Sequence, residues 1–192
     1  MKILQYLFIS LSHKILKILP YRLIRLLSVP IGTLYFLLTF RSSIKLFKRR
    51  KIFEKLKINY KPLIVKINYT RYWLETLWLT NKNFSKHITP HVEIENQEYV
   101  DKLKKQYPGL IFALPHLGNW EFAIPIGNSI KLNLLAVAEP LSNSYVLNWF
   151  KSLRESLGIE IIIGGKGQNT FDLLANKSVS YTHLRAHETQ LH

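Results

Sequence analysis

A histidine and a glutamate five positions apart in the string PHLGNWE are the residues of this chain best suited to acid–base chemistry. His116 follows the apolar run Leu110–Leu114, which has the composition of a buried parallel strand. A carboxylate that reaches an imidazole fixes its tautomer and stabilises the imidazolium that forms when the other ring nitrogen takes a proton. We therefore expect His116 to act as a general base toward a hydroxyl group, with Glu121 as its partner.

The residues between them favour the turn that this chemistry requires. Asn119 is a competent helix N-cap, and Glu121 in the first turn of a helix is favoured by the helix dipole. Gly118 lets backbone N–H groups approach a developing oxyanion. The string also lies where open α/β sheets bind ligands, at the carboxyl end of a strand. A structural histidine in a capped turn explains the same spacing, so a non-enzymatic binding protein is the alternative.

The surrounding patterns predict an α/β fold in which an incomplete sheet of βαβ units positions these residues. Short apolar runs predict strands at His91–Ile94, Leu110–Leu114, Leu134–Val137 and Ile159–Ile163. Helices are expected over Asn68–Thr80 and Glu95–Gln106, from about Asn119, over Asn143–Leu157, and from about Asn169. Gly158 is expected to end the helix that precedes it. Residues 58–177 are predicted to form this domain.

The N-terminal segment, residues 1–57, is both apolar and basic, which predicts membrane-associated helices. It holds thirteen Lys and Arg against one acid, Glu54, whereas residues 58–192 hold fourteen against eleven. Leu26–Phe40 runs fifteen residues without a charge, short of the ~20 that a helix needs to span a bilayer. An amphipathic stripe precedes it, formed by Leu4, Leu7, Phe8, Leu11, Ile15 and Ile18. We expect an anionic membrane surface as partner, although a helix packed on its own domain fits the stripe as well.

Composition removes several other classes of protein. The 192 residues suit one domain with membrane-facing additions, and 47% hydrophobic content excludes a disordered chain. The absence of cysteine excludes disulfides, thiolate metal sites and a cysteine nucleophile. The net charge of +15 leaves an RNA-binding module as a third hypothesis, but its concentration at the apolar end favours lipid, and no nucleic-acid partner is expected.

The last residues, 178–192, differ in character from everything before them. The string SVSYTHLRAHETQLH has three histidines and no apolar run, and it resembles the translation of an adapter joined to a gene. We expect a non-native tail that is disordered or forms an arbitrary helix. His183, His187 and Glu188 mimic a helical metal pair there, and Pro90 separates His87 from His91. No metal site is predicted.

Beyond the spacing, these strings carry a family likeness. HLGNWE, with LIFALP before it and AVAEPLSN and LRESLGIEIII after it, resembles the bacterial lipid A lauroyl/myristoyl acyltransferases and the related phosphatidylinositol mannoside acyltransferases. The likeness covers roughly Tyr60 to Lys177, and the apolar N-terminal segment is similar to that family's membrane anchor. It implies transfer of a fatty acyl chain from acyl carrier protein, or acyl-CoA, to a hydroxyl of a glycolipid such as a lipid A precursor. It also implies that the protein acts at the cytoplasmic face of the bacterial inner membrane. No cofactor is implied.

The resemblance also implies roles for single residues. His116 matches the catalytic base of the family, and Glu121 matches the acidic partner of its H-x4-D/E motif. Asn119 and Gly118 lie inside the motif near the substrate, and Trp120 matches a packing position. Arg154 falls where the family has an arginine near the substrate channel, which would bind a phosphate of the substrate. The later part of the family's domain would lie beyond Lys177, so we expect this chain to be an incomplete copy.

Overall fold

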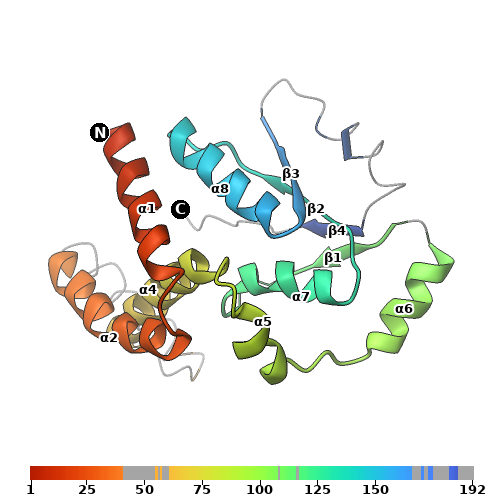
Figure 1. Ribbon diagram of the computed structural model, residues 1–192, viewed down its shortest axis with the longest axis horizontal. Coiled ribbons are helices and arrows are strands. Elements are labelled where there is room, and N and C mark those ends of the chain that lie inside the picture. Colours follow the sequence, from red (N-terminus) through yellow and green to blue (C-terminus); the bar gives the residue numbers. More distant parts are fainter. Residues whose placement is uncertain are drawn as a thin grey trace. The chain divides into compact units, whose positions relative to one another are not determined.

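The computed structural model describes residues 1–40, 55, 57, 61–107, 109–115, 117–165, 170, 173–174 and 182–185, the last of these as backbone only. The chain divides into two compact units (Figure 1). One comprises Met1–Ser12 and Thr80–His192, and the other comprises His13–Leu79. The boundary that the sequence predicts after residue 57 falls beside residues outside the described ranges, so it stays a prediction.

In the described residues of the His13–Leu79 unit, α2 (Tyr21–Leu38) packs against α4 (Pro62–Trp78). Buried residues recur every fourth position on α2, at Ile24, Ser28 and Gly32, which is the period of one helix face. A Cβ on Gly32 would lie 2.6 Å from the Cα of Ile67, so α2 and α4 meet here backbone to backbone. The helix runs through Pro30 as a single element.

Polar side chains in this unit form hydrogen bonds with neighbouring segments of the chain. His13, near the end of α1 (Lys2–Leu16), places its Nδ1 2.8 Å from the carbonyl oxygen of Leu77. The indole Nε1 of fully buried Trp78 donates to the carbonyl of Leu19 at 2.8 Å. The Tyr21 hydroxyl donates to the buried carboxylate of Glu75 at 3.0 Å. These bonds connect α4 to the end of α1, to the start of α2 and to the segment between them.

The other unit is an α/β sheet, as predicted, with its strands joined in parallel in the order β1-β4-β2-β3 (Figure 1). The strands are β1 (Ile111–Ala113), β2 (Leu134–Ala138), β3 (Ile159–Ile163) and β4 (Thr182–Arg185). The described helices of this unit are most of α1 together with α5 (Phe84–His87), α6 (Gln97–Gln106), α7 (Ala123–Ser129), α8 (Ser144–Ser156) and the 3-10 turns η1 (Thr89–His91) and η2 (Trp120–Phe122). Buried Ile124, Leu132, Leu134, Ile159 and Ile161 form its core.

Two predictions for this unit are wrong. The run His91–Ile94 forms no strand; its first residue ends η1, and Val92 is extended (φ −103°, ψ 123°) without pairing to any described strand. Apolar alternation alone does not make a strand, because a strand also requires a hydrogen-bonded neighbour. The second is the expectation of disorder or a helix throughout 178–192.

The backbone of residues 182–185 forms β4 and lies between β1 and β2, pairing Ile111 with His183 and Leu134 with Thr182. The facing edges of β1 and β2 present unpaired backbone groups, and an extended segment satisfies them with backbone bonds whatever its side chains are. Pairing of this kind does not report whether the segment is native, so the non-native tail stays a prediction.

Candidate active site

The candidate site begins where β1 ends. His116 itself lies outside the described residues. Beside it, the backbone N–H of Leu117 donates to the carbonyl of Pro115 at 2.8 Å. Gly118 adopts a left-handed backbone conformation with φ +63°, which L side chains rarely adopt and glycine enters freely. The chain therefore turns within a few residues of the strand, and the glycine is required by the turn.

Asn119 caps the element that follows, as predicted. Its Oδ1 accepts a hydrogen bond from the backbone N–H of Glu121 at 3.2 Å. The element starts as the 3-10 turn η2 and continues as α7, where the sequence predicts a single helix. The cap places Glu121 in the first turn, near the positive end of the helix dipole.

The Glu121 side chain is enclosed by protein, with 1% of the residue exposed. Both of its carboxylate oxygens bind Arg154, which lies on α8 and is 18% exposed. The Nη2–Oε1 distance is 2.6 Å and the Nε–Oε2 distance is 3.2 Å. Two parallel N–H···O bonds between a guanidinium and a carboxylate are the strongest pairing these groups make, and they fix the orientation of both.

Aromatic rings complete the environment of Arg154. The centre of its guanidinium lies 5.1 Å from the ring centroid of Trp120 and 5.8 Å from that of Phe150. Cations are attracted to the faces of aromatic rings at such distances. Arg154 is therefore held by an ion pair and two rings and is not an exposed helical arginine. Trp120 packs, as expected for the motif interior.

No pattern in the sequence indicates the pairing of Glu121 with Arg154, which are separated by 33 positions. Glu121 follows β1 and Arg154 lies on the helix after β2, and only the folding of the sheet brings these two elements together. Gly118, Asn119 and Glu121 share one turn, as the spacing predicts. Whether the His116 imidazole reaches Glu121 stays a prediction, because His116 is outside the described residues.

The arrangement can position a proton-transferring group but shows no metal-binding cluster. Within the described ranges, no three His, Asp or Glu side chains lie close enough to hold a metal ion. Of the tail residues considered above, His183 is described only by its backbone, and His187 and Glu188 lie outside the described part of the chain.

Comparison with known proteins identifies the family of this chain. The chain belongs to the bacterial lipid A biosynthesis acyltransferase family, whose pattern matches residues 1–175. It is similar to two curated relatives, both phosphatidylinositol mannoside acyltransferases, from Mycobacterium tuberculosis strains CDC 1551 / Oshkosh and ATCC 25618 / H37Rv. Each is 29% identical over 113 residues, which cover 57% of this chain and 35% of the relative's length. The resemblance drawn from the strings around His116 is confirmed.

Proposed function

We propose that the protein transfers a fatty acyl chain from acyl carrier protein or coenzyme A to a hydroxyl of a glycolipid such as a lipid A precursor. Family membership supports acyl transfer as the reaction class. The observation that carries the mechanism is the buried Glu121 carboxylate, held in place by Arg154 and by the Asn119 cap beside His116 in the sequence. A buried, oriented carboxylate next to a histidine is the arrangement that a general base requires.

In the proposed reaction, the His116 imidazole takes the proton from the acceptor hydroxyl while the oxygen attacks the thioester carbonyl of the donor. A tetrahedral oxyanion forms, and backbone N–H groups at the Gly118 turn stabilise its charge. The intermediate expels the thiolate of the carrier, which receives the proton from the imidazolium. Glu121 stabilises the imidazolium between these two transfers. The products are the acylated glycolipid and the free thiol of the carrier.

Arg154 has two proposed roles. Its first is to hold the Glu121 carboxylate in one orientation, because its fork grips both oxygens. Its second is to bind a phosphate of the donor or acceptor. Arginine commonly binds phosphate groups, because the planar fork of its N–H donors matches their oxygens. A residue that touches both the carboxylate and the substrate would couple acceptor binding to the orientation of Glu121.

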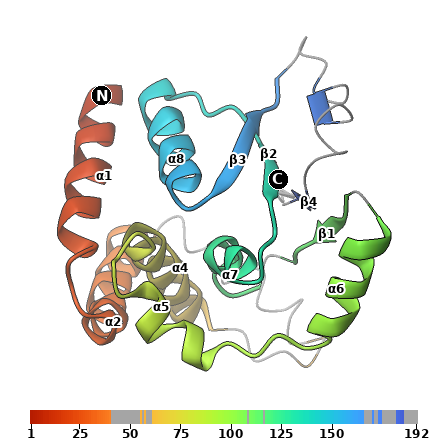
Figure 2. The ribbon, with the colours of Figure 1, turned by 45° about the vertical axis from the view of Figure 1, so that its right-hand side comes forward.

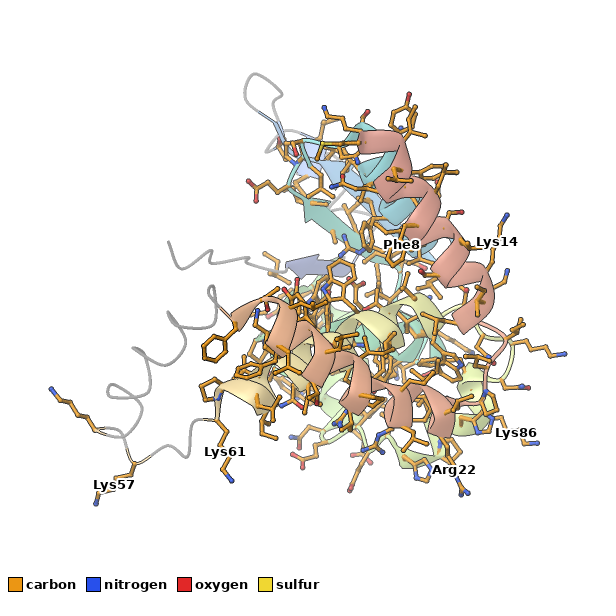
Figure 3. All side chains as sticks on the ribbon, turned by 90° about the vertical axis from the view of Figure 1, so that its left-hand side faces the viewer. Phe8, Lys14, Arg22, Lys57, Lys61 and Lys86 are labelled. Atoms are coloured by element: carbon orange, nitrogen blue, oxygen red, sulfur yellow. The ribbon has the colours of Figure 1, made fainter. Side chains whose placement is uncertain are left out.

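The N-terminal helices supply the proposed contact with a membrane at the cytoplasmic face of the bacterial inner membrane. The predicted stripe on α1 is exposed: Leu4, Leu7, Phe8, Leu11 and Ile15 are each at least half accessible to solvent. Residues 1–40 carry five Lys and Arg and no Asp or Glu. Figure 3 shows the side chains of this region, with Phe8 and Lys14 leaving α1 on different sides. An exposed apolar stripe with basic neighbours suits an anionic lipid surface.

By length and composition, α2 is able to cross a bilayer, with a mean hydropathy of 1.3 over its 18 residues. Helices with the same properties also occur as core helices of soluble proteins and as signal sequences. One face of α2 is occupied by α4 through the Gly32 contact, while Leu26, Leu34 and Leu37 are exposed on it. These exposed leucines give α2 an apolar surface of its own that is available to lipid.

The test of acyl transfer uses the longest product of the gene that contains this chain. Glycolipid acylation is measured with acyl carrier protein and coenzyme A thioesters for the wild type, His116→Ala and Glu121→Gln. We expect turnover to fall roughly 10²–10⁴-fold in His116→Ala, which is the usual contribution of a general base. His91→Ala, at an exposed position, is the matched control and keeps wild-type turnover. Wild-type turnover in both site variants would contradict the proposed mechanism, whereas no acyl transfer by the wild type would favour the non-enzymatic binding protein.

A further inference from the structure

Asn143 connects α1 to α8 inside the unit that holds the candidate site. Its Oδ1 accepts hydrogen bonds from the backbone N–H groups of Tyr145 at 3.2 Å and Val146 at 3.5 Å, which caps α8. Its Nδ2 donates to the carbonyl of Lys2 at 3.0 Å and to the Gln5 Oε1 at 2.9 Å. The residue is buried. The side-chain amide of Asn143 therefore accepts hydrogen bonds from α8 with its oxygen and donates hydrogen bonds to α1 with its nitrogen.

A second contact between the same helices lies beside this one. The rings of Tyr6 and Tyr145 are 6.1 Å apart between centroids, and Figure 2 shows α1 running next to α8. Successive residues turn by about 100° around a helix axis, which places Gln5 and Tyr6 on the side of α1 opposite its apolar stripe. The stripe residues of this unit, Leu4, Leu7, Phe8 and Leu11, are exposed. Within this unit, α1 thus has one side fixed to α8 and an apolar side open to solvent.

The far end of α8 carries the candidate site. Arg154 lies in the last turn of this helix and grips the Glu121 carboxylate with two bonds. Between its two ends, α8 is anchored by the buried side chains of Phe150 and Leu153. Because a helix of 13 residues moves as a rod, a constraint at its Asn143 cap reaches Arg154 without a further link.

We propose that Asn143 is a positioning residue that transmits membrane attachment of α1 to the Arg154–Glu121 pair. A lipid surface that covers the apolar side of α1 restricts the motion of this helix. The two donor bonds of Asn143 then restrict α8 as well, so Arg154 stays against Glu121 for a larger fraction of time. This inference rests on the proposed function in one respect, which is that α1 binds lipid.

Two variants cut the link from opposite sides. Asn143→Asp keeps an oxygen that caps α8, because aspartate caps helices as well as asparagine does, but it lacks the N–H donors to α1. Gln5→Ala removes one acceptor from α1 and leaves Asn143 unchanged. Neither change touches the apolar stripe. Ser10→Ala is the control, since it alters α1 away from these bonds. The double variant Asn143→Asp/Gln5→Ala measures whether the two residues act through one contact.

The experiment follows amide hydrogen exchange in residues 144–156 of the full chain, with and without vesicles of phosphatidylethanolamine and phosphatidylglycerol. We expect the vesicles to slow exchange in this segment about threefold or more in the wild type and in Ser10→Ala. Asn143→Asp and Gln5→Ala should bind the vesicles with affinities within roughly threefold of the wild type but show no slowing in α8. The double variant should behave as either single variant does.

The outcomes separate this inference from the proposed function. If Asn143→Asp and Gln5→Ala keep the full slowing, the link does not pass through Asn143 and the inference is wrong. If the wild type binds vesicles and α8 exchange does not change, the inference is wrong while membrane attachment stands. If the wild type does not bind vesicles, the membrane part of the proposed function fails and the inference fails with it, whereas the acyl-transfer assay on His116→Ala is unaffected.

Discussion

Glu121, which follows β1, and Arg154, on α8, form a bidentate ion pair in which the carboxylate is enclosed and the guanidinium lies over the rings of Trp120 and Phe150. Removing one member of a buried pair leaves the other charge uncompensated, which is costly in a low-dielectric environment. The pair therefore contributes to the fold as well as to the proposed chemistry, and these two contributions are separable by experiment.

Arg154→Met should lower the free energy of unfolding by roughly 3–5 kcal/mol, because it removes the positive charge that balances the buried Glu121 carboxylate. Urea unfolding monitored by circular dichroism measures this loss. The double variant Glu121→Gln/Arg154→Met carries no buried charge and should recover part of it. Equal or greater loss in the double variant would contradict the assignment of the cost to an unpaired charge.

The same two residues should move the pH dependence of acyl transfer in opposite directions. Arg154→Met leaves the negative charge of Glu121 uncompensated, which favours the protonated His116, so activity on the acid side should be lost at higher pH than in the wild type. Glu121→Gln removes the negative charge and should shift that loss to lower pH. Profiles of kcat/KM against pH report it. Shifts of the same sign in both variants, or none, would argue against His116 as the base beside this pair.

Gly32→Ala should destabilise the pair of helices α2 and α4. The new Cβ would meet the Cα of Ile67 at 2.6 Å, and backbone atoms cannot move aside as a flexible side chain does. Overpacking of this kind costs about 1–3 kcal/mol, partly offset by the higher helix propensity of alanine. Gly165→Ala is the control, since no atom of the described residues lies within 4 Å of its added Cβ. Thermal unfolding of both variants distinguishes a packing effect from a general effect of glycine replacement.

Stability should fall as the pH is lowered through the usual His range, in part through His13. Burial lowers the pKa of His13 below its ordinary value of 6.5, against the bond from its Nδ1–H to the Leu77 carbonyl, which raises it. The unfolded chain therefore takes up this proton at higher pH than the folded one. The stabilisation of the folded state by neutral His13 is therefore complete above pH 6.5. It is lost as the pH falls below this value, by at most about 1.4 kcal/mol of unfolding free energy per pH unit.

His13→Asn removes the titrating group and keeps a donor for Leu77, so the difference in unfolding free energy between pH 7.5 and pH 5 should shrink, measured by urea unfolding at about those two pH values. The matched variant is His91→Asn, at an exposed position. A pH dependence equal to that of the wild type in His13→Asn would show that His13 does not contribute.

Leu7→Ser and Phe8→Ser should weaken binding to anionic vesicles roughly tenfold each, because a Leu or Phe side chain that inserts fully contributes about 1.5–3 kcal/mol. Lys14→Gln and Lys17→Gln should weaken it less and lower its dependence on salt. Co-sedimentation with vesicles measures both effects. An RNA-binding module predicts instead that RNA is shifted by the wild type, with an affinity that falls steeply as salt increases.

Local chemistry in the sequence was enough to predict most elements of the sheet unit. Leu134–Ala138 is a continuous apolar run, and Ile159–Ile163 has four isoleucines with Glu160 between the first two, so both favour strands of a largely buried sheet. Gly158, with φ +90°, follows the end of α8 in a conformation that favours glycine. Asn119 caps η2 because its side chain reaches an N–H group two residues away. These features depend on residues that are close together in the sequence, so composition and spacing alone are enough to predict them.

Only the tertiary structure decided which residues distant in sequence meet and which side chains stay exposed. The spacing of His116 and Glu121 suggested a partner for the imidazole, but nothing in it indicated that Arg154 holds the same carboxylate from another helix. Likewise, the apolar period of α1 predicts a helix without telling whether its stripe is covered, and folding leaves Leu4 and Phe8 exposed while Asn143 fixes the opposite side. Burial and charge pairing depend on which elements meet, and this depends on the packing of the whole sheet rather than on any stretch of sequence.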